Sequence, residues 1–144
     1  GLFYIIRTSW VYSNTGHNFY LTMKRLSQER KELKVVCDMK GVPTSNHFIA
    51  KQIQKIIPYL NEKNTGVYHL VPDGSCSWFE FAKEIISQTN PQFNLNNLYG
   101  IRTHEFPTKT RRPANSVLGN AKIKNFFNLN LSSWVQELHK IFDV

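Results

Sequence analysis

The sequence predicts an α/β fold, because segments with strand character alternate with amphipathic helical segments along its 144 residues. The strand signals are short, apolar and rich in β-branched residues, whereas the helical segments place apolar residues three and four positions apart. Only three strands are convincing, although a doubly wound sheet usually has about five or six. We therefore expect one folded unit, residues 1–144, that belongs to a larger α/β protein.

The predicted strands are apolar runs bounded by turn residues. They comprise residues 2–7, 33–38 and 66–71, with a shorter strand near 98–102. Turns are expected at residues 39–45, where Gly41 and Pro43 occur, and at residues 72–75, which read PDGS. The rest of residues 90–113 carries no periodic pattern, so we expect it to be irregular.

The predicted helices begin at side chains that can cap a helix N-terminus. They comprise residues 19–31, which follow a loop at 13–18, residues 45–57, a helix from Ser77, residues 120–127, and a last helix capped by Ser133 and Gln136. Ser77 and Glu80 have the spacing of a capping box. Pro58 should end or bend the second helix, because it cannot donate a backbone hydrogen bond. The buried face of that helix is expected to contain Ile49, Ile53, Ile56, Ile57 and Leu60.

Composition excludes several classes of protein. No apolar run approaches the roughly 20 residues needed to span a bilayer. Cys37 and Cys76 form no Cys-x-x-Cys pair, and the five histidines lack metal-ligand spacing. We therefore expect a cytoplasmic protein with reduced cysteines, no metal site and no membrane contact.

The net charge of +8 favours an anionic partner such as nucleic acid, acidic lipid or a phosphorylated small molecule. The densest basic cluster is KTRRP at residues 109–113, which is short and interrupted by Pro113. These features indicate a shaped site for a small anion more than a nucleic-acid tail. A basic nucleic-acid module fits the charge, but no recognised motif supports it. Surplus lysine that keeps the surface soluble is the simplest alternative.

Six blocks of the sequence carry a more specific signal. They are RTSWVY (7–12), NFYLTMKRL (18–26), VVCDMKGVPTS (35–45), GVYHLVPDGSCSWFEFA (66–82), EFPTKTRRPANSVL (105–118) and LNLSSWVQELHKI (129–141). Together, and in this order, they resemble the C-terminal half of the dTDP-4-dehydrorhamnose reductases, which are extended short-chain dehydrogenases/reductases. Any single block is weak, but the combination covers nearly the whole chain.

The resemblance implies a Rossmann-like N-terminal part that binds NADPH or NADH and a C-terminal part that closes over a nucleotide sugar. It implies hydride transfer to dTDP-4-dehydrorhamnose, which gives dTDP-rhamnose for cell-surface polysaccharide. In the family, the RTSW strand follows the cofactor fingerprint and the catalytic Tyr-x-x-x-Lys. We therefore expect a fragment, natural or engineered, that has no catalytic or cofactor-binding residue and is inactive alone. Its seven glycines are too widely spaced for G-x-G-x-x-G.

Two Tyr-x-x-x-Lys matches, Tyr20–Lys24 and Tyr59–Lys63, are not expected to be catalytic. Such a short pattern arises readily by chance. Tyr20–Lys24 also lies downstream of the family's catalytic pair, so we expect an ordinary i, i+4 pair on a helix.

The resemblance implies substrate contacts at Trp10 and Arg112. Trp10 lies where the first strand ends, and open α/β sheets place ligands at that edge. An indole face can cover a sugar ring, and a guanidinium fork suits two oxygens of a diphosphate. Arg111 and Asn18 are weaker candidates. The alternatives are a core tryptophan and surface arginines.

These positions lie about 100 residues apart, so the prediction requires residues 105–116 to fold back across the end of the RTSW strand. The chain also departs from the family pattern. Met39 replaces a Gln, Lys109 and Thr110 replace a Pro-Ala pair, and Asn115 replaces the acidic residue of related epimerases, as it does in the reductases. The roles of the first three positions stay open, as does the choice between NADH and NADPH.

A second class of function is a non-catalytic binding protein. The regulatory subunit of some methionine adenosyltransferases resembles the same family without acting as a reductase. The upstream sequence and the neighbouring genes would discriminate, because rhamnose-pathway genes favour the reductase. For the reductase we expect a dTDP-sugar partner. For the isolated chain we expect a dimer, a strand-swapped form or aggregation, since unpaired strand edges invite self-association.

Overall fold

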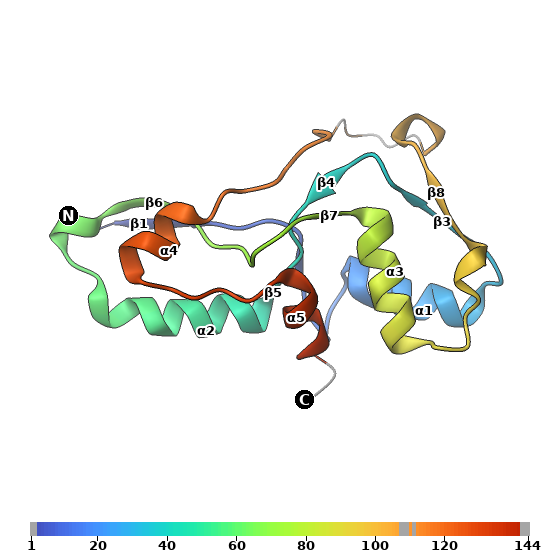
Figure 1. Ribbon diagram of the computed structural model, residues 1–144, viewed down its shortest axis with the longest axis horizontal. Coiled ribbons are helices and arrows are strands. Elements are labelled where there is room, and N and C mark those ends of the chain that lie inside the picture. Colours follow the sequence, from blue (N-terminus) through green and yellow to red (C-terminus); the bar gives the residue numbers. More distant parts are fainter. Residues whose placement is uncertain (1–2, 107–109, 111, 142–144) are drawn as a thin grey trace.

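The computed structural model describes residues 3–106, 110 and 112–141. Its longer elements pack at the two ends of an elongated molecule, with short strand pairs between them (Figure 1). One end contains strands β1 (Tyr4–Arg7) and β6 (Gly66–His69) with helices α2 (Asn46–Ile56) and α4 (Ala121–Phe127). The other end contains strands β3 (Leu33–Val36) and β8 (Leu98–Ile101) with helices α1 (Phe19–Glu29) and α3 (Trp78–Thr89).

Both longer strand pairs are parallel, β1 with β6 and β3 with β8. Their registers run from Tyr4↔Gly66 to Arg7↔His69 and from Leu33↔Leu98 to Val36↔Ile101. All four strands fall within the segments that the sequence predicts, so those predictions are confirmed. Because parallel strands end at the same edge, the chain leaves β1 and β6 on one side of the pair.

Two shorter pairs lie in the middle of the molecule. Strand β2 (Val11–Tyr12) runs parallel to β5 (Thr44–Ser45), and β4 (Lys40–Gly41) runs antiparallel to β7 (Cys76–Ser77). The expectation of a simple turn over residues 39–45 is wrong, because this segment contributes both β4 and β5. Two-residue strands form through hydrogen bonds to distant segments, so they carry no period-2 pattern that a local reading can detect.

Buried apolar side chains form one cluster at each end. The cluster under β1 and β6 includes Phe48, Tyr68, Leu70 and Ile123. The cluster around α1 and α3 includes Tyr12, Tyr20, Phe81, Ile85 and Leu98. Helices thus cover strand pairs through apolar faces, which is the layered arrangement of an α/β fold.

The helix starts agree with the capping residues of the sequence. The N-cap residues of α2, α3 and α5 (Trp134–His139) are Ser45, Ser77 and Ser133. At α3, the Ser77 hydroxyl accepts a hydrogen bond from the Glu80 N–H at 3.1 Å, and the Glu80 carboxylate accepts one from the Ser77 N–H at 2.6 Å. This capping box fixes the start of α3, whose first residue is Trp78.

The buried face of α2 differs from the prediction. The buried positions are Phe48, Gln52 and Ile56. The predicted residues Ile49, Ile53 and Leu60 are half-buried. Ile57 is 59% exposed, because α2 ends at Ile56 and Pro58 follows in the 3-10 turn η1 (Ile57–Tyr59). The buried row contains a glutamine, so isoleucine spacing alone placed the face incorrectly.

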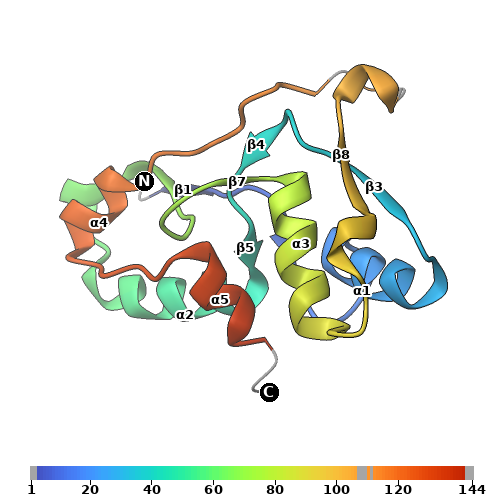
Figure 2. The same ribbon diagram turned by 45° about the vertical axis from the view of Figure 1, so that its right-hand side comes forward.

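The remaining elements are the short 3-10 turns η2 (Glu62–Asn64), η3 (Leu95–Asn97) and η4 (Thr103–Glu105). Residues 112–120 run from the β8 end toward α4 and pass beside β4 (Figure 2). Within the described ranges, no helix has both the length and the apolar character needed to cross a membrane.

Candidate functional site

Trp10 occupies a strained position between β1 and β2. Its φ is 44°, in the left-handed region that a bulky residue rarely adopts. Such a conformation costs on the order of 1–3 kcal/mol and persists only where the surroundings enforce it. Here the Thr44 N–H donates to the Trp10 carbonyl at 3.2 Å, and the Ser9 hydroxyl donates to the Val42 carbonyl at 3.0 Å. The central strands therefore fix the sharp turn that directs the indole toward β4.

Both faces of the Trp10 indole are covered. Trp78 stacks on one face, with ring centroids 3.6 Å apart and planes 10° apart. A Cβ atom on Gly41 would lie 2.3, 2.5 and 2.6 Å from Cε2, Nε1 and Cζ2 of the indole. Three neighbouring ring atoms at such similar distances place Gly41 over a ring face, and Trp78 stacks in parallel contact on the other. Only glycine fits at this close approach.

The Trp10 indole N–H is a candidate hydrogen-bond donor to a ligand. The Trp10 N–H donates no hydrogen bond to the part of the chain that the structure describes, and its nitrogen is not among the buried unpaired atoms. Because Trp78 and Gly41 contact the two ring faces, the edge of the indole and its N–H are the parts of Trp10 that could contact a ligand with least rearrangement.

Trp78 is itself held in place by its neighbours. It follows the capping box of α3, and the β4–β7 pairing sets Lys40 opposite Ser77. The Phe19 ring lies 4.6 Å from Trp78 and stacks on Phe81 at 5.6 Å. A continuous column of rings therefore connects Trp10 to the core at the α1–α3 end.

Residues 112–116 return to the site along β4. The Lys40 N–H donates to the Ala114 carbonyl at 2.8 Å, and the N–H and hydroxyl of Ser116 donate to the Lys40 carbonyl at 2.9 and 3.0 Å. Lys40 and Asn115 form a parallel bridge. The predicted return of this segment across the end of the RTSW strand is thus confirmed for the described residues 112–116.

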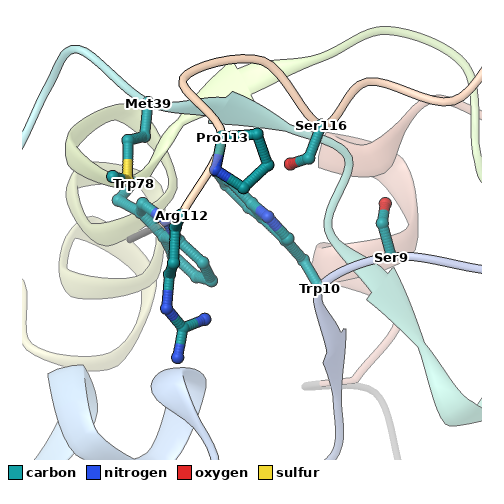
Figure 3. Close-up of a pocket in the computed structure, with 7 residues that line it drawn as sticks. All are labelled: Ser9, Trp10, Met39, Trp78, Arg112, Pro113 and Ser116. Carbon is teal, nitrogen blue, oxygen red and sulfur yellow. The ribbon is translucent and has the colours of Figure 1, made fainter. Parts of the chain in front are cut away.

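These segments line a cavity of about 250 Å³ that is partly open to solvent (Figure 3). It is lined by Ser9, Trp10, Met39, Trp78, Arg112, Pro113 and Ser116. In Figure 3 the Arg112 side chain passes beside the two indoles, and the hydroxyls of Ser9 and Ser116 lie across Trp10 from Trp78. The cavity volume is below the roughly 300–1,000 Å³ typical of sites that enclose a whole ligand, so the cavity can hold only part of a drug-sized ligand.

The lining groups combine apolar walls with a few polar groups. The hydroxyl hydrogens of Ser9 and Ser116 are directed to backbone carbonyls, so both oxygens present lone pairs to a ligand. Arg112 supplies an exposed cation with a fork of donors. The set matches the needs of a sugar joined to a phosphate: acceptors and a donor for hydroxyl groups, and a guanidinium for phosphate oxygens.

The structure brings together two of the four predicted substrate residues, Trp10 and Arg112. Asn18 does not line the cavity: its Oδ1 accepts from the Leu21 N–H at 3.1 Å, and its Nδ2 donates to two backbone carbonyls as the N-cap of α1. Arg111 and Lys109 lie outside the described residues. Thr110 is described but does not line the cavity.

Trp78 and Met39 also line the cavity, but the sequence analysis did not predict either as a site residue. Trp78 is the first residue of α3, directly after the N-cap Ser77. Its position after the capping box was the available signal. Nothing in the local sequence indicated that Met39 would line the cavity.

Neither Tyr-x-x-x-Lys match lies at the cavity. Tyr20 is 2% exposed and packs in the core, and burial raises its pKa. A catalytic acid needs a pKa near the working pH, so this shift is in the wrong direction. Tyr59 and Lys63 lie in two separate exposed 3-10 turns.

Two carboxylates near the site have structural roles. The Thr103 hydroxyl donates to Asp38 at 2.6 Å and lowers its pKa, which joins the end of β3 to η4. Hydrogen bonds from the N–H and hydroxyl of Ser77 lower the pKa of Glu80. Across the described residues, no group of three or more His, Cys, Asp or Glu side chains has the geometry to hold a metal ion.

Known proteins resemble this chain over nearly its full length. It is 38% identical over 135 residues to a dTDP-4-dehydrorhamnose reductase from Escherichia coli strain K12, an alignment that covers 90% of this chain and 45% of the relative. The crystal structure of a dTDP-4-dehydrorhamnose reductase from Bacillus anthracis, solved in complex with NADP, matches with a TM-score of 0.87 and 38% identity over 97% of this chain and 48% of that one. The reductase from Clostridium acetobutylicum matches with a TM-score of 0.85 and 37% identity over the same shares of the two chains.

The chain therefore spans about half the length of the relatives it matches, and its fold is that of the C-terminal half of an extended short-chain dehydrogenase/reductase. The family described as the RmlD substrate binding domain matches residues 2–144. On this match, the chain belongs to the RmlD substrate binding domain family.

Proposed function

We propose that this chain is the substrate-binding portion of a dTDP-4-dehydrorhamnose reductase, which reduces dTDP-4-dehydrorhamnose to dTDP-rhamnose with NADPH or NADH. The observation that carries the proposal is the meeting of Trp10 and Arg112 in one cavity, although about 100 residues separate them. Family membership and identity to named reductases support the same substrate class.

Each polar group at the cavity has a proposed contact. Arg112 binds the diphosphate through two N–H groups, and Arg111, which lies outside the described residues, is proposed to assist it. Trp10 contacts the sugar through its indole edge, where the N–H donates to a sugar oxygen. The Ser9 and Ser116 oxygens accept hydrogen bonds from sugar hydroxyls. Asn18 contributes indirectly, because it caps the helix whose first residue, Phe19, packs on Trp78.

The residues of this chain do not fit a nicotinamide cofactor. Binding of a dinucleotide diphosphate uses a glycine-rich turn between a strand and a helix. Among the described residues, the loop between β2 and α1 contains a single glycine, Gly16. Helices α2 and α3 begin directly after β5 and β7, which leaves no glycine-rich turn between strand and helix. We therefore propose that the 144 residues alone neither bind NADPH nor reduce a keto sugar, and that the cofactor is bound elsewhere in the full-length enzyme.

The proposal is tested by calorimetric titration of the purified chain with dTDP-rhamnose and with NADPH. We expect saturable binding of the nucleotide sugar and none of NADPH. NADPH oxidation in the presence of dTDP-4-dehydrorhamnose should equal that of a heat-killed control. Absence of dTDP-rhamnose binding by a folded chain contradicts the proposed ligand. NADPH turnover contradicts the proposal that the cofactor is bound outside these 144 residues.

We also propose that the isolated chain self-associates. Within the described part of the chain, β1 and β6 pair only with each other, so the outer edge of each strand has no strand partner. Phe3 and Ile5 are about half exposed at β1, at 55% and 48%.

A further inference from the structure

Trp10 is unusual because two independent features constrain the same side chain. Its backbone is held at a φ of 44°, and its ring is stacked on Trp78 at 3.6 Å. A strained backbone is maintained only when neighbouring contacts over-determine it. The stacked Trp78 ring is one such contact, and it comes from α3, not from the segment between β1 and β2 that contains Trp10.

Trp78 is in turn fixed from three directions. The capping box sets the start of α3, the β4–β7 pairing sets the strand before it, and Phe19 packs on its ring at 4.6 Å. Trp78 therefore has a well-defined position before any ligand binds. A rigid aromatic surface in this position restricts the Trp10 indole to one orientation, with its edge rather than its face toward the cavity.

We propose that Trp78 is a positioning residue, which holds the Trp10 indole edge-on so that its N–H points to an oxygen of the bound sugar. This inference rests on the proposed function. It adds that Trp78 determines which part of the Trp10 indole contacts the sugar. It predicts a ligand part that carries a hydrogen-bond acceptor at Trp10 rather than a flat face of C–H groups. Pre-ordering the donor avoids the loss of side-chain freedom that binding would otherwise require.

The stack itself is tested by circular dichroism, without any ligand. Two indoles in close parallel contact couple their transitions and give an exciton couplet in the far ultraviolet. The chain has three tryptophans, so each can be removed in turn. We expect the couplet to disappear in Trp10→Phe and Trp78→Phe. It should persist in Trp134→Phe, because Trp134 contacts the Phe81 ring edge-on at 6.0 Å instead of a second indole.

The effect on binding is tested with two ligands, dTDP-rhamnose and dTDP, titrated into wild type, Trp78→Leu, Trp78→Phe and Trp134→Phe. Loss of an aromatic pair corresponds to about a threefold to tenfold loss of affinity. We expect that loss in Trp78→Leu for dTDP-rhamnose only, with dTDP affinity within about twofold of wild type. Trp78→Phe, which keeps a flat ring against Trp10, should restore most of the dTDP-rhamnose affinity. Thermal unfolding of each variant checks that it is folded at the temperature of the titration.

Several outcomes overturn the inference. A wild-type chain without the couplet has no such stack. Equal losses for both ligands in Trp78→Leu indicate a general packing role, and no loss indicates that Trp78 does not position Trp10. If wild type keeps the couplet but binds neither ligand, the proposed function fails and the positioning role fails with it, while the couplet shows that the stack was intact.

Discussion

Gly41 contacts the face of the Trp10 indole so closely that a Cβ at position 41 would lie 2.3 Å from Cε2. The backbone of Gly41 is not in the left-handed region, so an alanine is excluded there by the indole and not by its φ angle. This contact links β4 to the end of β1 and forms one side of the aromatic stack.

Gly41→Ala should therefore destabilise the chain. Inserting a methyl group into a filled contact costs about 1–3 kcal/mol of unfolding free energy. Urea denaturation followed by tryptophan fluorescence measures this loss and also the displacement of the indole. Gly119→Ala is the matched control, because nothing lies within 4 Å of its Cβ position and its φ is not positive. The control should change stability by less than about 1 kcal/mol, and equal losses in both variants would argue against a steric conflict with Trp10.

Arg112→Ala should weaken nucleotide-sugar binding specifically. Loss of a charge-assisted clamp costs about 1.5–3 kcal/mol, or roughly tenfold to a hundredfold in affinity. In a full-length enzyme rebuilt around this chain, NADPH affinity should stay nearly unchanged. Arg30→Ala, an exposed arginine at the end of α1, removes the same charge away from the cavity and is the control. Both affinities are measured by titration at one ionic strength. Equal losses of affinity for the two ligands would indicate a folding defect. An unchanged affinity for the nucleotide sugar would show that Arg112 does not bind it.

Glu80 should make stability depend on acid pH. Hydrogen bonds from the Ser77 N–H and hydroxyl lower its pKa below the ordinary value of 4.5, so the folded state favours the carboxylate. This stabilisation is complete above pH 4.5 and is lost as the pH falls through the lowered pKa.

Glu80→Gln should therefore be less stable than wild type at pH 7, by about 0.5–1 kcal/mol for this exposed cap. The difference should shrink as the pH falls toward 3. Urea unfolding at both pH values measures it, with Glu32→Gln, an exposed residue between α1 and β3, as the control. A difference of the same size at both pH values would show that ionisation of Glu80 is not its cause.

The isolated chain should self-associate through the outer edge of β1. Ile5 is 48% exposed on this strand, so an apolar edge is open to a second copy. Analytical ultracentrifugation should show a sedimentation coefficient that rises with protein concentration. Ile5→Lys should restore a monomer, because a charged side chain opposes edge pairing, whereas Val117→Lys, on an exposed segment without a strand, should not. A wild-type chain that stays monomeric at high concentration would contradict this.

Helix starts were the part of the fold that local sequence predicted best. A serine that caps a helix accepts a hydrogen bond from a backbone N–H three residues later, so both partners lie within one short stretch of sequence. Ser45, Ser77 and Ser133 are therefore found from the sequence and confirmed in the structure. Helix ends were less certain: α1 ends at Glu29 and not at Lys31, since Arg30 already has an extended backbone.

The sequence by itself determined the alternation of strands and helices, the capping residues, the family and the choice of Trp10 and Arg112 as candidate site residues. These depend on local patterns or on blocks that can be read in order. Only the tertiary structure decided that Trp78 and Gly41 contact the faces of the Trp10 indole, and this arrangement favours the proposed edge contact with a sugar over the expected face contact. The physical reason is that this stack depends on the hydrogen bonds that pair β4 with β7 and on the turn at Trp10, which join positions far apart in the chain and leave no periodic trace in it.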